Sequence, residues 1–397
     1  MNSLPVEGYQ DYLEKLLEVK LPAAASQERE VFDQAADSPE VSLIIYGAGW
    51  LGLMLLEGLR ANGVEPVAFI DRSEIAQNRG AGDLEVLSPE VAARRFGAHA
   101  VIVVAVWNPS VPGGVRSIVE QLINYGCRRV VPFTQVFWKY QETFLPYYLC
   151  DLPSRILPQA DRVRRAYTLF DEPESRLEFL RQLEMRLTGD LTSLPPPTSD
   201  PQYFSHRLFR PLGTEYFVDC GAYDGDSLLG LAEWTGGTFQ QAVAFEADPQ
   251  NFARLERRIA ADQRFSGRTR ALPVAVGRTR CRLRFEASGM GNAALSDEGN
   301  IEVDCVPLDE VLDAEAPTYI KMDIEGAEMD ALAGAEGVIT QNAPLLAICA
   351  YHTQNHMWEI PIRIRELLPE YRLFLRMHCV DGFDLVCYAI PSWRRQS

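Results

Sequence analysis

The sequence predicts an α/β protein built from two doubly wound domains in tandem. In two separate regions a short apolar strand runs directly into a glycine-rich turn: residues 41–46 lead into GAGWLG, and residues 216–218 lead into DCGAYDG. After each turn, apolar strands alternate with segments of helical periodicity, which is the pattern of a largely parallel sheet covered by helices. The length of 397 residues also exceeds what one ordinary core accommodates, so two domains are expected.

Composition narrows the class of protein before any motif is considered. Apolar residues make up 47% and charged residues 23%, a soluble globular profile, and a net charge of -17 argues against nucleic acid as a main partner. No apolar run approaches the roughly 18 residues needed to span a bilayer, and the amino terminus lacks the order of a secretion signal. We therefore expect a cytoplasmic protein without a membrane partner. Eight scattered cysteines without a CxxC pair predict neither a disulfide framework nor a zinc site.

Residues 1–40 are expected to form an N-terminal helical segment. The apolar side chains between residues 9 and 19 fall largely on one helical face, which predicts a helix that packs within the protein or contacts a second subunit of a homo-oligomer. Internal packing is the preferred interpretation. The small and acidic residues 23–40 are interpreted as a connection into the first domain.

The first domain is assigned to residues 41–138. Its opening strand is followed by Gly47, Gly49 and Gly52 in GxGxxG spacing, a helix over residues 51–61, and a strand over 66–70 that ends in Asp71. In dinucleotide-binding folds the glycines permit a tight turn and the acid accepts from a ribose. Strands are expected at 100–106 and 129–133, with a helix at 115–125 between them. These segments complete a sheet of four or five strands.

This arrangement resembles the truncated Rossmann-type domain at the front of sugar acyltransferases, where the domain holds a nucleotide sugar. Three interpretations of the turn stay open: a bound nucleotide or nucleotide sugar, a bound nicotinamide cofactor, or a fold kept for packing. Residues 139–213 then form a helical linker region, with amphipathic helices over 163–187 and an irregular SLPPPTSDP segment in which consecutive prolines remove backbone donors.

The second domain is assigned to residues 214–397. Five strands, at 216–218, 242–245, 271–275, 319–322 and 344–350, alternate with helices at 227–234, 249–261 and, after EGAE, up to residue 335. A helix at 360–368 and two strands, at 371–377 and 385–390 with the short link VDGFD between them, close the domain. The sequence predicts a seven-stranded, mostly parallel sheet whose last strand is antiparallel, with two alternating segments, 280–285 and 301–306, inserted.

Four chemically distinctive residues are expected at strand ends, where ligands bind in such sheets: Asp219, Glu246, Asp323 and His352. An acid before the first glycine, in a turn without Lys, suits a ligand with a positive centre such as a sulfonium and its amino acid. Glu246 is placed to accept from two ribose hydroxyls. The alternatives are a helix-capping acid at Asp219 and an exposed charge at Glu246.

The string IKMDIEGAE combines a Lys in a buried strand with three acids. Asp323 and Glu325 are interpreted as a pair that holds a divalent ion or takes a proton from a hydroxyl, and equally as residues that orient a cofactor or cap the next helix. His352 and His356 would form a metal pair only on a helix, so His352 alone is preferred as a base or substrate contact, with a structural histidine as the alternative.

Residues 216–390 resemble the FkbM family of S-adenosylmethionine-dependent methyltransferases, on the motifs FVDCGAYDGDS, VAFEADPQNFARL, LPVAVG, VPLDEVL, YIKMDIEGAEMDALAGAE and AYH. The resemblance implies a class I methyltransferase sheet and O-methylation of a hydroxyl, often on a sugar or polyketide. It further implies that Asp219, Gly221 and Tyr223 line the methionine portion of the cofactor, Glu246 holds the ribose, Ala275 lies near the adenine, and Asp323 lies beside the transferred methyl.

We therefore predict an S-adenosylmethionine-dependent O-methyltransferase acting on a hydroxyl of a sugar, glycan or natural product. The alternatives are a non-catalytic nucleotide or nucleotide-sugar binding protein with a retained methyltransferase fold, and an NAD-dependent oxidoreductase. The catalytic candidates are Asp323, Glu325 and His352; no residue is assigned as a metal ligand, and the need for a divalent ion is left open. The cofactor-binding candidates are Asp219, Gly221, Ala222, Tyr223, Asp224, Glu246, Ala247, Ala275, Val276 and Asp323 in the second domain, and Gly47, Gly49, Gly52 and Asp71 in the first.

Overall fold

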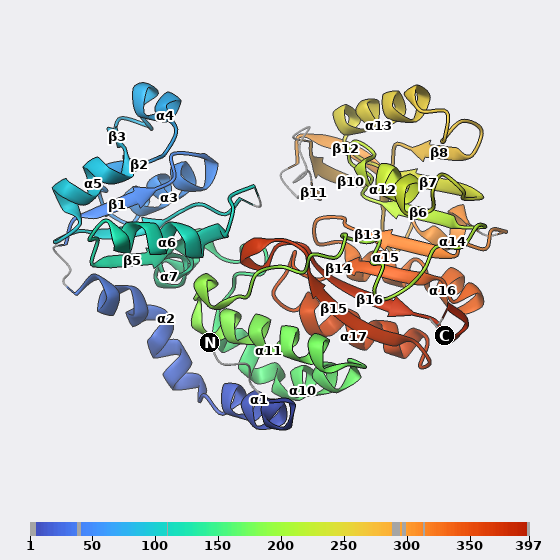
Figure 1. The fold of residues 1–397 in the computed structure, drawn as a ribbon, viewed down its shortest axis with the longest axis horizontal. Coiled ribbons are helices and arrows are strands. Elements are labelled where there is room, and N and C mark those ends of the chain that lie inside the picture. The colour runs from blue at the N-terminus through green and yellow to red at the C-terminus, as the bar shows by residue number, and fades with distance from the viewer. Residues whose placement is uncertain are drawn as a thin grey trace. The chain divides into compact units, whose positions relative to one another are not determined.

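Five parallel strands form the sheet of the N-terminal part: β1 (Leu43–Tyr46), β2 (Ala68–Ile70), β3 (Val86–Leu87), β4 (Val101–Val104) and β5 (Arg129–Pro132) (Figure 1). The computed structural model describes residues 5–37, 41–108, 110–287, 294–295, 299–312 and 314–394. The strand order is β3-β2-β1-β4-β5. The chain therefore adds β2 and β3 on one side of β1, and then adds β4 and β5 on the other side. In doubly wound folds this switch point is where ligands bind.

The helices of the N-terminal part follow from apolar periodicity. Those that connect the strands are α3 (Trp50–Ala61), α4 (Glu74–Arg79), α5 (Pro89–Phe96) and α6 (Gly114–Asn124), and those that follow β5 are α7 (Phe133–Lys139), α8 (Gln141–Phe144) and α9 (Pro153–Ile156). The helices α3 and α6 and the flanking strands match the prediction to within a few residues. The prediction contained none of α4, β3 and α5, which lie between β2 and β4.

The N-terminal segment corrects one expectation. The helix α1 (Tyr9–Leu17) forms as predicted, but residues 23–40 were expected to be a connection and most of them belong to α2 (Leu21–Ala36). The face of α2 that carries Ala24, Glu28, Phe32 and Ala36 is buried, and these residues recur every four positions. Small and acidic composition concealed this period, although Ala, Gln, Glu and Arg are good helix formers.

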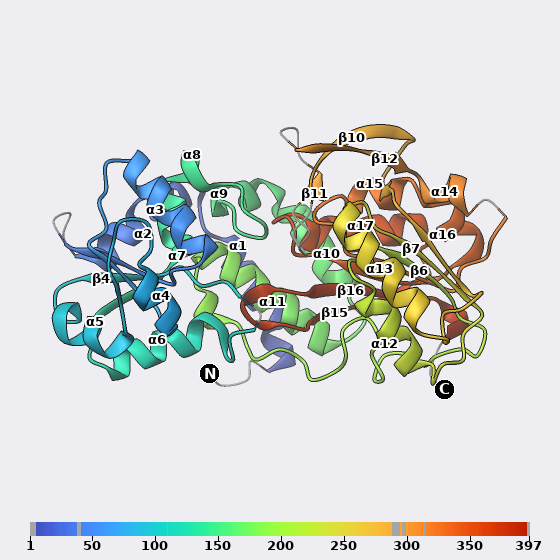
Figure 2. The same cartoon turned by 90° about the horizontal axis from the view of Figure 1, so that it is seen from above.

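A second, seven-stranded sheet has the order β15-β16-β14-β13-β6-β7-β8. Its strands are β6 (Tyr216–Cys220), β7 (Gln241–Phe245), β8 (Thr269–Leu272), β13 (Tyr319–Met322), β14 (Leu345–Cys349), β15 (Arg372–Met377) and β16 (Leu385–Ile390). All pairs are parallel except those of β16, which runs antiparallel to both β14 and β15; Figure 2 shows β15 and β16 side by side. The predicted antiparallel last strand is confirmed, and the switch point falls between β6 and β13.

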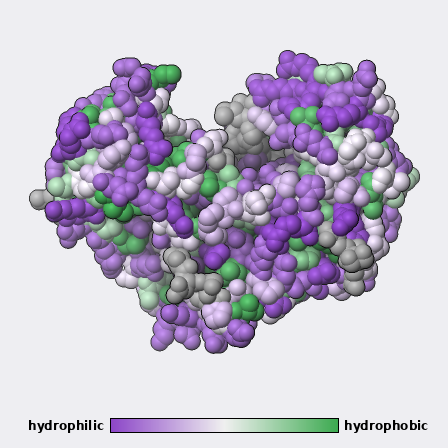
Figure 3. All heavy atoms as spheres, viewed as in Figure 1, coloured by the Kyte–Doolittle hydropathy of each residue, from purple (hydrophilic) through white to green (hydrophobic). Residues whose placement is uncertain are grey.

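Most helices of this part follow the prediction, but two of those described, at 308–311 and 336–342, were not predicted. The helices are α12 (Asp226–Trp234), α13 (Pro249–Ala261), α14 (Leu308–Val311), α15 (Glu328–Ala333), α16 (Glu336–Asn342) and α17 (His356–Leu367), preceded by α10 (Ala160–Leu169) and α11 (Pro173–Thr188). The helix α13 buries Leu255, while the surface over it in Figure 3 is mostly hydrophilic. None of the helices in the described part of the chain is long and apolar enough to cross a membrane.

One strand prediction of this part needs correction. The expected single strand at 271–275 is two strands in different sheets, because β8 ends at Leu272 and Ala275 begins β9 (Ala275–Val276). The strand β9 pairs with β12 (Ile301–Val306) in a smaller sheet of order β11-β10-β12-β9, which also contains β10 (Cys281–Glu286) and β11 (Ala294–Leu295). A proline at 273 separates β8 from β9, and proline cannot donate to a strand ladder.

The two compact units of the chain are interleaved along the sequence. One unit comprises Met1–Ala160, Phe179–Pro197 and Cys379–Phe383, and the other comprises Asp161–Glu178, Thr198–His378 and Asp384–Ser397. We call them the N-terminal and the C-terminal unit. The link between β15 and β16 therefore packs in the N-terminal unit, although both strands belong to the C-terminal unit.

Candidate active site

The strand β6 runs two residues further than predicted and places Asp219 inside the sheet instead of at its edge. In the parallel register of β6 with β13, Asp219 is the partner of Lys321, and both side chains are almost fully buried. The Lys321 Nζ lies 3.0 Å from Asp219 Oδ1, and the Ser227 hydroxyl donates to Asp219 Oδ2 at 2.6 Å. We expected Asp219 to face a cationic ligand, but in the structure its positive partner is the lysine of the neighbouring strand.

Burial and charge act in opposite directions on this pair. Burial raises the pKa of the Asp219 carboxyl, and the charge of Lys321 only partly offsets that effect. For Lys321, burial lowers the pKa, but the charges of Asp219 and Asp323 outweigh burial and raise it. The Lys321 ammonium also donates to the Gly221 carbonyl at 2.6 Å. The ion pair of Asp219 and Lys321 thus holds the turn that follows β6 in place.

The turn after β6 contacts the turn after β13. Gly221 has φ +81°, and a side-chain carbon added there would lie 1.8 Å from the Asp323 carbonyl oxygen. The Asp323 N–H donates to the Cys220 carbonyl at 3.0 Å. Glycine is therefore required at Gly221 for the close approach of two backbone segments at the switch point.

Glu246 follows β7 and holds the same turn through its carboxylate. Its Oε2 accepts from the Tyr223 N–H and its Oε1 accepts from the Asp248 N–H, both at 2.8 Å. Burial raises the pKa of Glu246 to about 7, and the two backbone donors oppose that rise. Each carboxylate oxygen retains a second lone pair, so Glu246 can accept from two further hydroxyl donors.

The other predicted cofactor residues of the C-terminal unit differ in how close they lie to this turn. Ala222 is fully buried with its N–H donated to the Phe245 carbonyl, and Asp224 Oδ2 lies 2.5 Å from the Arg258 guanidinium of α13. Ala247 lies between Glu246 and Asp248, in the same strand-end segment. Ala275 and Val276 form β9 in the smaller sheet, and the structure shows no hydrogen bond from either to the turn.

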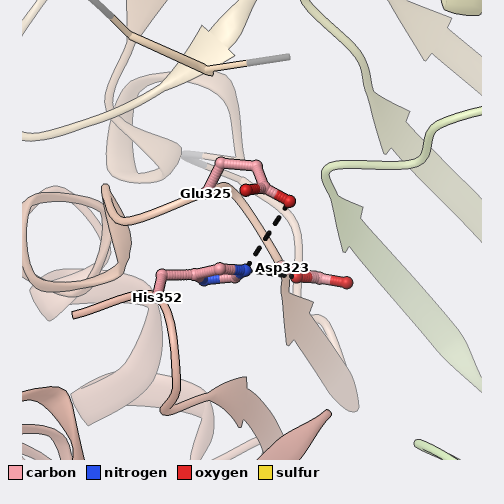
Figure 4. Close-up of side chains that lie close together, drawn as sticks. All are labelled: Asp323, Glu325 and His352. Carbon is pink, nitrogen blue, oxygen red and sulfur yellow. Dashed lines mark ion pairs between the residues drawn. The ribbon is translucent and has the colours of Figure 1, made fainter. Parts of the chain in front are cut away.

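Asp323, Glu325 and His352 come together at the ends of β13 and β14 (Figure 4). The His352 Nε2 lies 3.2 Å from Asp323 Oδ1 and 3.7 Å from Glu325 Oε1. Glu325 has φ +52°, which is uncommon for a residue with a side chain. The turn after β13 thus brings two carboxylates, two residues apart in sequence, to one side of the imidazole.

Glu328 lies on the other side of this imidazole and was not assigned a role from the sequence, although it belongs to the IKMDIEGAE string. Its Oε1 is 2.7 Å from His352 Nδ1 and accepts from the Ile324 N–H, while its Oε2 is 3.2 Å from His356 Nδ1. The helix α17 begins only at His356, so the two histidines do not share a helical face. They share one buried carboxylate instead.

The charges of this cluster set its protonation. Burial raises the pKa of Asp323, but the hydrogen bond from His352 and the charge of Lys321 outweigh burial and bring it down to about 2. Burial lowers the pKa of His352, but Glu328, Asp323 and Glu325 together raise it well above the ordinary value. The surrounding carboxylates therefore favour the cationic form of the imidazole.

Tyr203 completes the site from a segment in which the sequence predicts no regular structure. Its hydroxyl donates to Asp323 Oδ2 at 2.7 Å, and Lys321 Nζ lies 5.2 Å from its ring centroid. The Tyr203 N–H donates to the Tyr388 hydroxyl oxygen at 2.9 Å, and its φ is +64°. The site therefore contains more titratable groups than the three catalytic candidates Asp323, Glu325 and His352, because Tyr203, Glu328 and Lys321 adjoin them.

The predicted glycine turn of the N-terminal unit has a similar construction. Gly47 has φ +106°, and a side-chain carbon at Gly52 would lie 1.8 Å from the Gly47 carbonyl oxygen, whereas Gly49 has open space around it. Asp71 Oδ2 accepts from the Ala48 N–H at 2.8 Å. An acid that ends the second strand thus binds the turn after the first strand, as Glu246 does in the C-terminal unit.

Aromatic side chains accompany this turn. Trp50, the first residue of α3, is 61% exposed and stacks on Tyr147 with ring centroids 6.1 Å apart. Trp107, three residues after β4, contacts the rings of Tyr147 and Tyr148 at 5.5 Å. An exposed indole beside a glycine turn offers a flat apolar surface to a sugar or a base.

The seven-stranded sheet of order β15-β16-β14-β13-β6-β7-β8 has the class I methyltransferase arrangement, and its strand-end residues lie at the β6/β13 switch point. Residues 219–376 match the family described as Methyltransferase FkbM domain. This match over part of the chain supports a methyltransferase function.

A solved structure with a similar fold covers nearly the whole chain. The chain is similar to the crystal structure of Methyltransferase FkbM from Methylobacillus flagellatus KT, with 23% identity and a TM-score of 0.76 over 97% of this chain and 98% of that one. A precorrin-6y C5,15-methyltransferase from Geobacter metallireducens GS-15 matches at 9% identity and a TM-score of 0.29, over 46% of this chain and 84% of that one, too low a score to indicate a common fold. No curated protein matches this sequence.

Proposed function

We propose that the protein is an S-adenosylmethionine-dependent O-methyltransferase that acts on a hydroxyl of a sugar, glycan or natural product. The observation that carries this proposal is the pairing of the Glu246-bound turn with Asp323 across the switch point between β6 and β13. On one side of the switch point, Glu246 offers hydrogen-bond acceptors to a nucleoside. On the other side, Asp323 offers a carboxylate to a hydroxyl. A hydroxyl that receives a methyl group must lose its proton, and a nearby carboxylate can take that proton.

The residues present fit the proposed cofactor. Glu246 would hold the ribose, because two hydroxyl donors would stabilise a carboxylate whose pKa burial has raised to about 7. The turn from Gly221 to Tyr223 would hold the methionine portion through its backbone, and Asp219 and Lys321 would keep that turn in place. When bound, S-adenosylmethionine supplies an electrophilic methyl group on a sulfonium.

The residues around Asp323 would prepare the acceptor. Asp323 would accept a hydrogen bond from the acceptor hydroxyl and so orient its oxygen, with Tyr203 and His352 fixing the carboxylate. Glu325, whose Oε1 lies 3.7 Å from His352 Nε2 on the same side of the imidazole as Asp323, would receive the proton. Orientation of this kind accounts for much of the rate of a two-reactant transfer.

A transfer assay tests this proposal. With methyl-labelled S-adenosylmethionine and a panel of nucleotide sugars, glycans and polyketide alcohols, the chain should label at least one hydroxyl. Asp323→Ala should reduce transfer by about 100-fold or more while calorimetric affinity for the cofactor changes little. Asp330→Ala, an exposed acid on α15, is the control. Tight binding of NADH without heat from S-adenosylmethionine or its demethylated product would instead favour an oxidoreductase, and full activity of Asp323→Ala would remove that residue from the reaction.

A second proposal concerns the N-terminal unit, where Asp71 and the exposed Trp50 favour a nucleotide or nucleotide sugar. Calorimetry with UDP-glucose, GDP-mannose and NADH should show binding of a nucleotide sugar that Asp71→Ala weakens about tenfold, since a hydrogen bond to a charged acceptor contributes roughly 1.5 kcal/mol or more. Glu74→Ala, an exposed acid of α4, should leave the affinity unchanged. Binding of none of the three would favour a turn kept for packing, and binding of NADH alone would favour the nicotinamide interpretation.

A further inference from the structure

The Asp323, Glu325 and His352 side chains offer a nitrogen and two carboxylate oxygens that all lie within 4.8 Å of one another. They come from the turns after β13 and β14, two adjacent parallel strands whose backbone is held by the sheet. Three ligand atoms at this spacing would need to move little to contact one ion. Ligand atoms on rigid elements are a feature of sites that bind metals selectively.

The contacts around these three residues favour coordination over a simple ion pair. Asp323 Oδ2 is engaged by the Tyr203 hydroxyl at 2.7 Å, which leaves Oδ1 directed toward His352. Glu328 Oε1 lies 2.7 Å from His352 Nδ1, so it can take the Nδ1–H of a neutral imidazole and leave the Nε2 lone pair toward the two carboxylates. A buried carboxylate behind a ligating histidine is the usual outer contact of a metal site.

Charge balance supports the same conclusion. Asp323 and Glu325 lie beside the His352 imidazole, Glu328 contacts both His352 and His356, and Lys321 Nζ is 3.0 Å from Asp219 Oδ1. A carboxylate removed from water requires compensating charge. A divalent cation at His352 Nε2 would add positive charge beside Asp323 and Glu325.

We propose that Asp323, Glu325 and His352 bind a divalent cation of the Mg²⁺ or Mn²⁺ type, with Glu328 orienting His352 and Tyr203 orienting Asp323. Two carboxylates and one imidazole without a thiolate suit such a cation. This deepens, and rests on, the proposed methyl transfer to oxygen. Three protein ligands leave positions for two acceptor oxygens, so the acceptor class is a vicinal diol or a hydroxy acid, whose hydroxyl the cation makes more acidic.

Cation binding can be measured without cofactor or acceptor, so its failure is distinguishable from failure of the proposed transfer. Titration of Mn²⁺ into the full chain, followed by the electron paramagnetic resonance signal of free Mn²⁺, should show one bound ion, with Mg²⁺ competing. Asp323→Asn and Glu325→Gln should each weaken binding at least tenfold, and Glu328→Gln by about 10- to 100-fold. Asp330→Asn should leave it unchanged.

A second measurement uses the unmodified chain, so its main result does not depend on whether a variant folds. In the unmodified chain, electron spin echo modulation of bound Mn²⁺ should show the nitrogen of one imidazole, and His352→Gln should abolish that signal. Absence of Mn²⁺ binding at millimolar concentration, the same affinity in all variants, or bound Mn²⁺ without a nitrogen signal would each overturn the proposal.

Discussion

Single residues of the site owe their positions to contacts far apart in the sequence. Asp323 meets Tyr203 across 120 residues, and His352 meets Glu328 across 24. The Tyr203 hydroxyl holds one oxygen of Asp323, which leaves the other oxygen with a defined direction. Removing that hydroxyl should therefore change how Asp323 acts without changing the fold around the ring.

Tyr203→Phe should lower kcat about tenfold and leave the affinity for S-adenosylmethionine unchanged, because it removes one hydrogen bond to a charged carboxylate and keeps the aromatic ring. Tyr371→Phe is a matched control, since Tyr371 is also buried and its hydroxyl donates to the Pro344 carbonyl. Steady-state kinetics and cofactor calorimetry on both variants separate a positioning role from a loss of stability. Equal kcat in the two variants would contradict a positioning role for Tyr203.

The sequence could predict that Asp323, Glu325 and His352 lie together because each follows an apolar strand, and parallel strands end at a common edge. It could not predict Tyr203, which lies in an irregular segment after three prolines and is held by long-range bonds. The partner of Asp219 was missed for another reason. A lysine far along the sequence becomes a neighbour of Asp219 only when the register of β6 and β13 is known.

At the scale of elements, the segment that carries Tyr203 is tied to β15 and β16 by a half-buried histidine. The His378 Nδ1 lies 3.0 Å from the Asp200 carbonyl oxygen, and its Nε2 lies 2.7 Å from the Tyr388 hydroxyl. The imidazole can satisfy both contacts when neutral, donating from Nδ1 and accepting at Nε2. Burial lowers the pKa of His378 to about 4, Arg376 lowers it further, and the Asp200 backbone and charge oppose this.

Stability of the C-terminal unit should therefore fall as the pH decreases from about 6.5 to about 4. In this window the unfolded chain binds a proton at His378 that the folded chain does not, so acid favours unfolding. A pKa lowered from 6.5 to about 4 corresponds, at 1.36 kcal/mol per unit, to roughly 3 kcal/mol. Denaturant unfolding across this range should show a shallower pH slope for His378→Gln, whereas His99→Gln, an exposed histidine, should keep the original slope. An unchanged slope in His378→Gln would show that other groups cause the acid sensitivity.

Element predictions succeeded where apolar period and turn residues agreed, as in α3, α13 and β13. The helix α2 was missed because its composition was read without its four-residue period, and β8 and β9 were merged because one apolar run continues past Pro273. Strand length was underestimated at β6, where an acid was taken as the end of the strand. Lys321 neutralises that acid and lets the strand continue.

For the whole molecule, the sequence predicted two α/β sheets and the antiparallel position of β16. Nothing in the sequence indicated that Cys379–Phe383 packs in the N-terminal unit. There Asp381, predicted only as part of a polar link, is buried: both its oxygens accept from the Val115 N–H at the start of α6, and its carbonyl accepts from Trp107. A five-residue link carries too little periodicity to reveal such a contact.

This link constrains the order in which the chain matures during synthesis. A domain made first usually folds as it leaves the ribosome, before later domains are translated. Here the carboxylate that binds the first turn of α6 is translated 266 residues after Val115. The first turn of α6 therefore lacks this acceptor until the segment that contains Asp381 has left the ribosome.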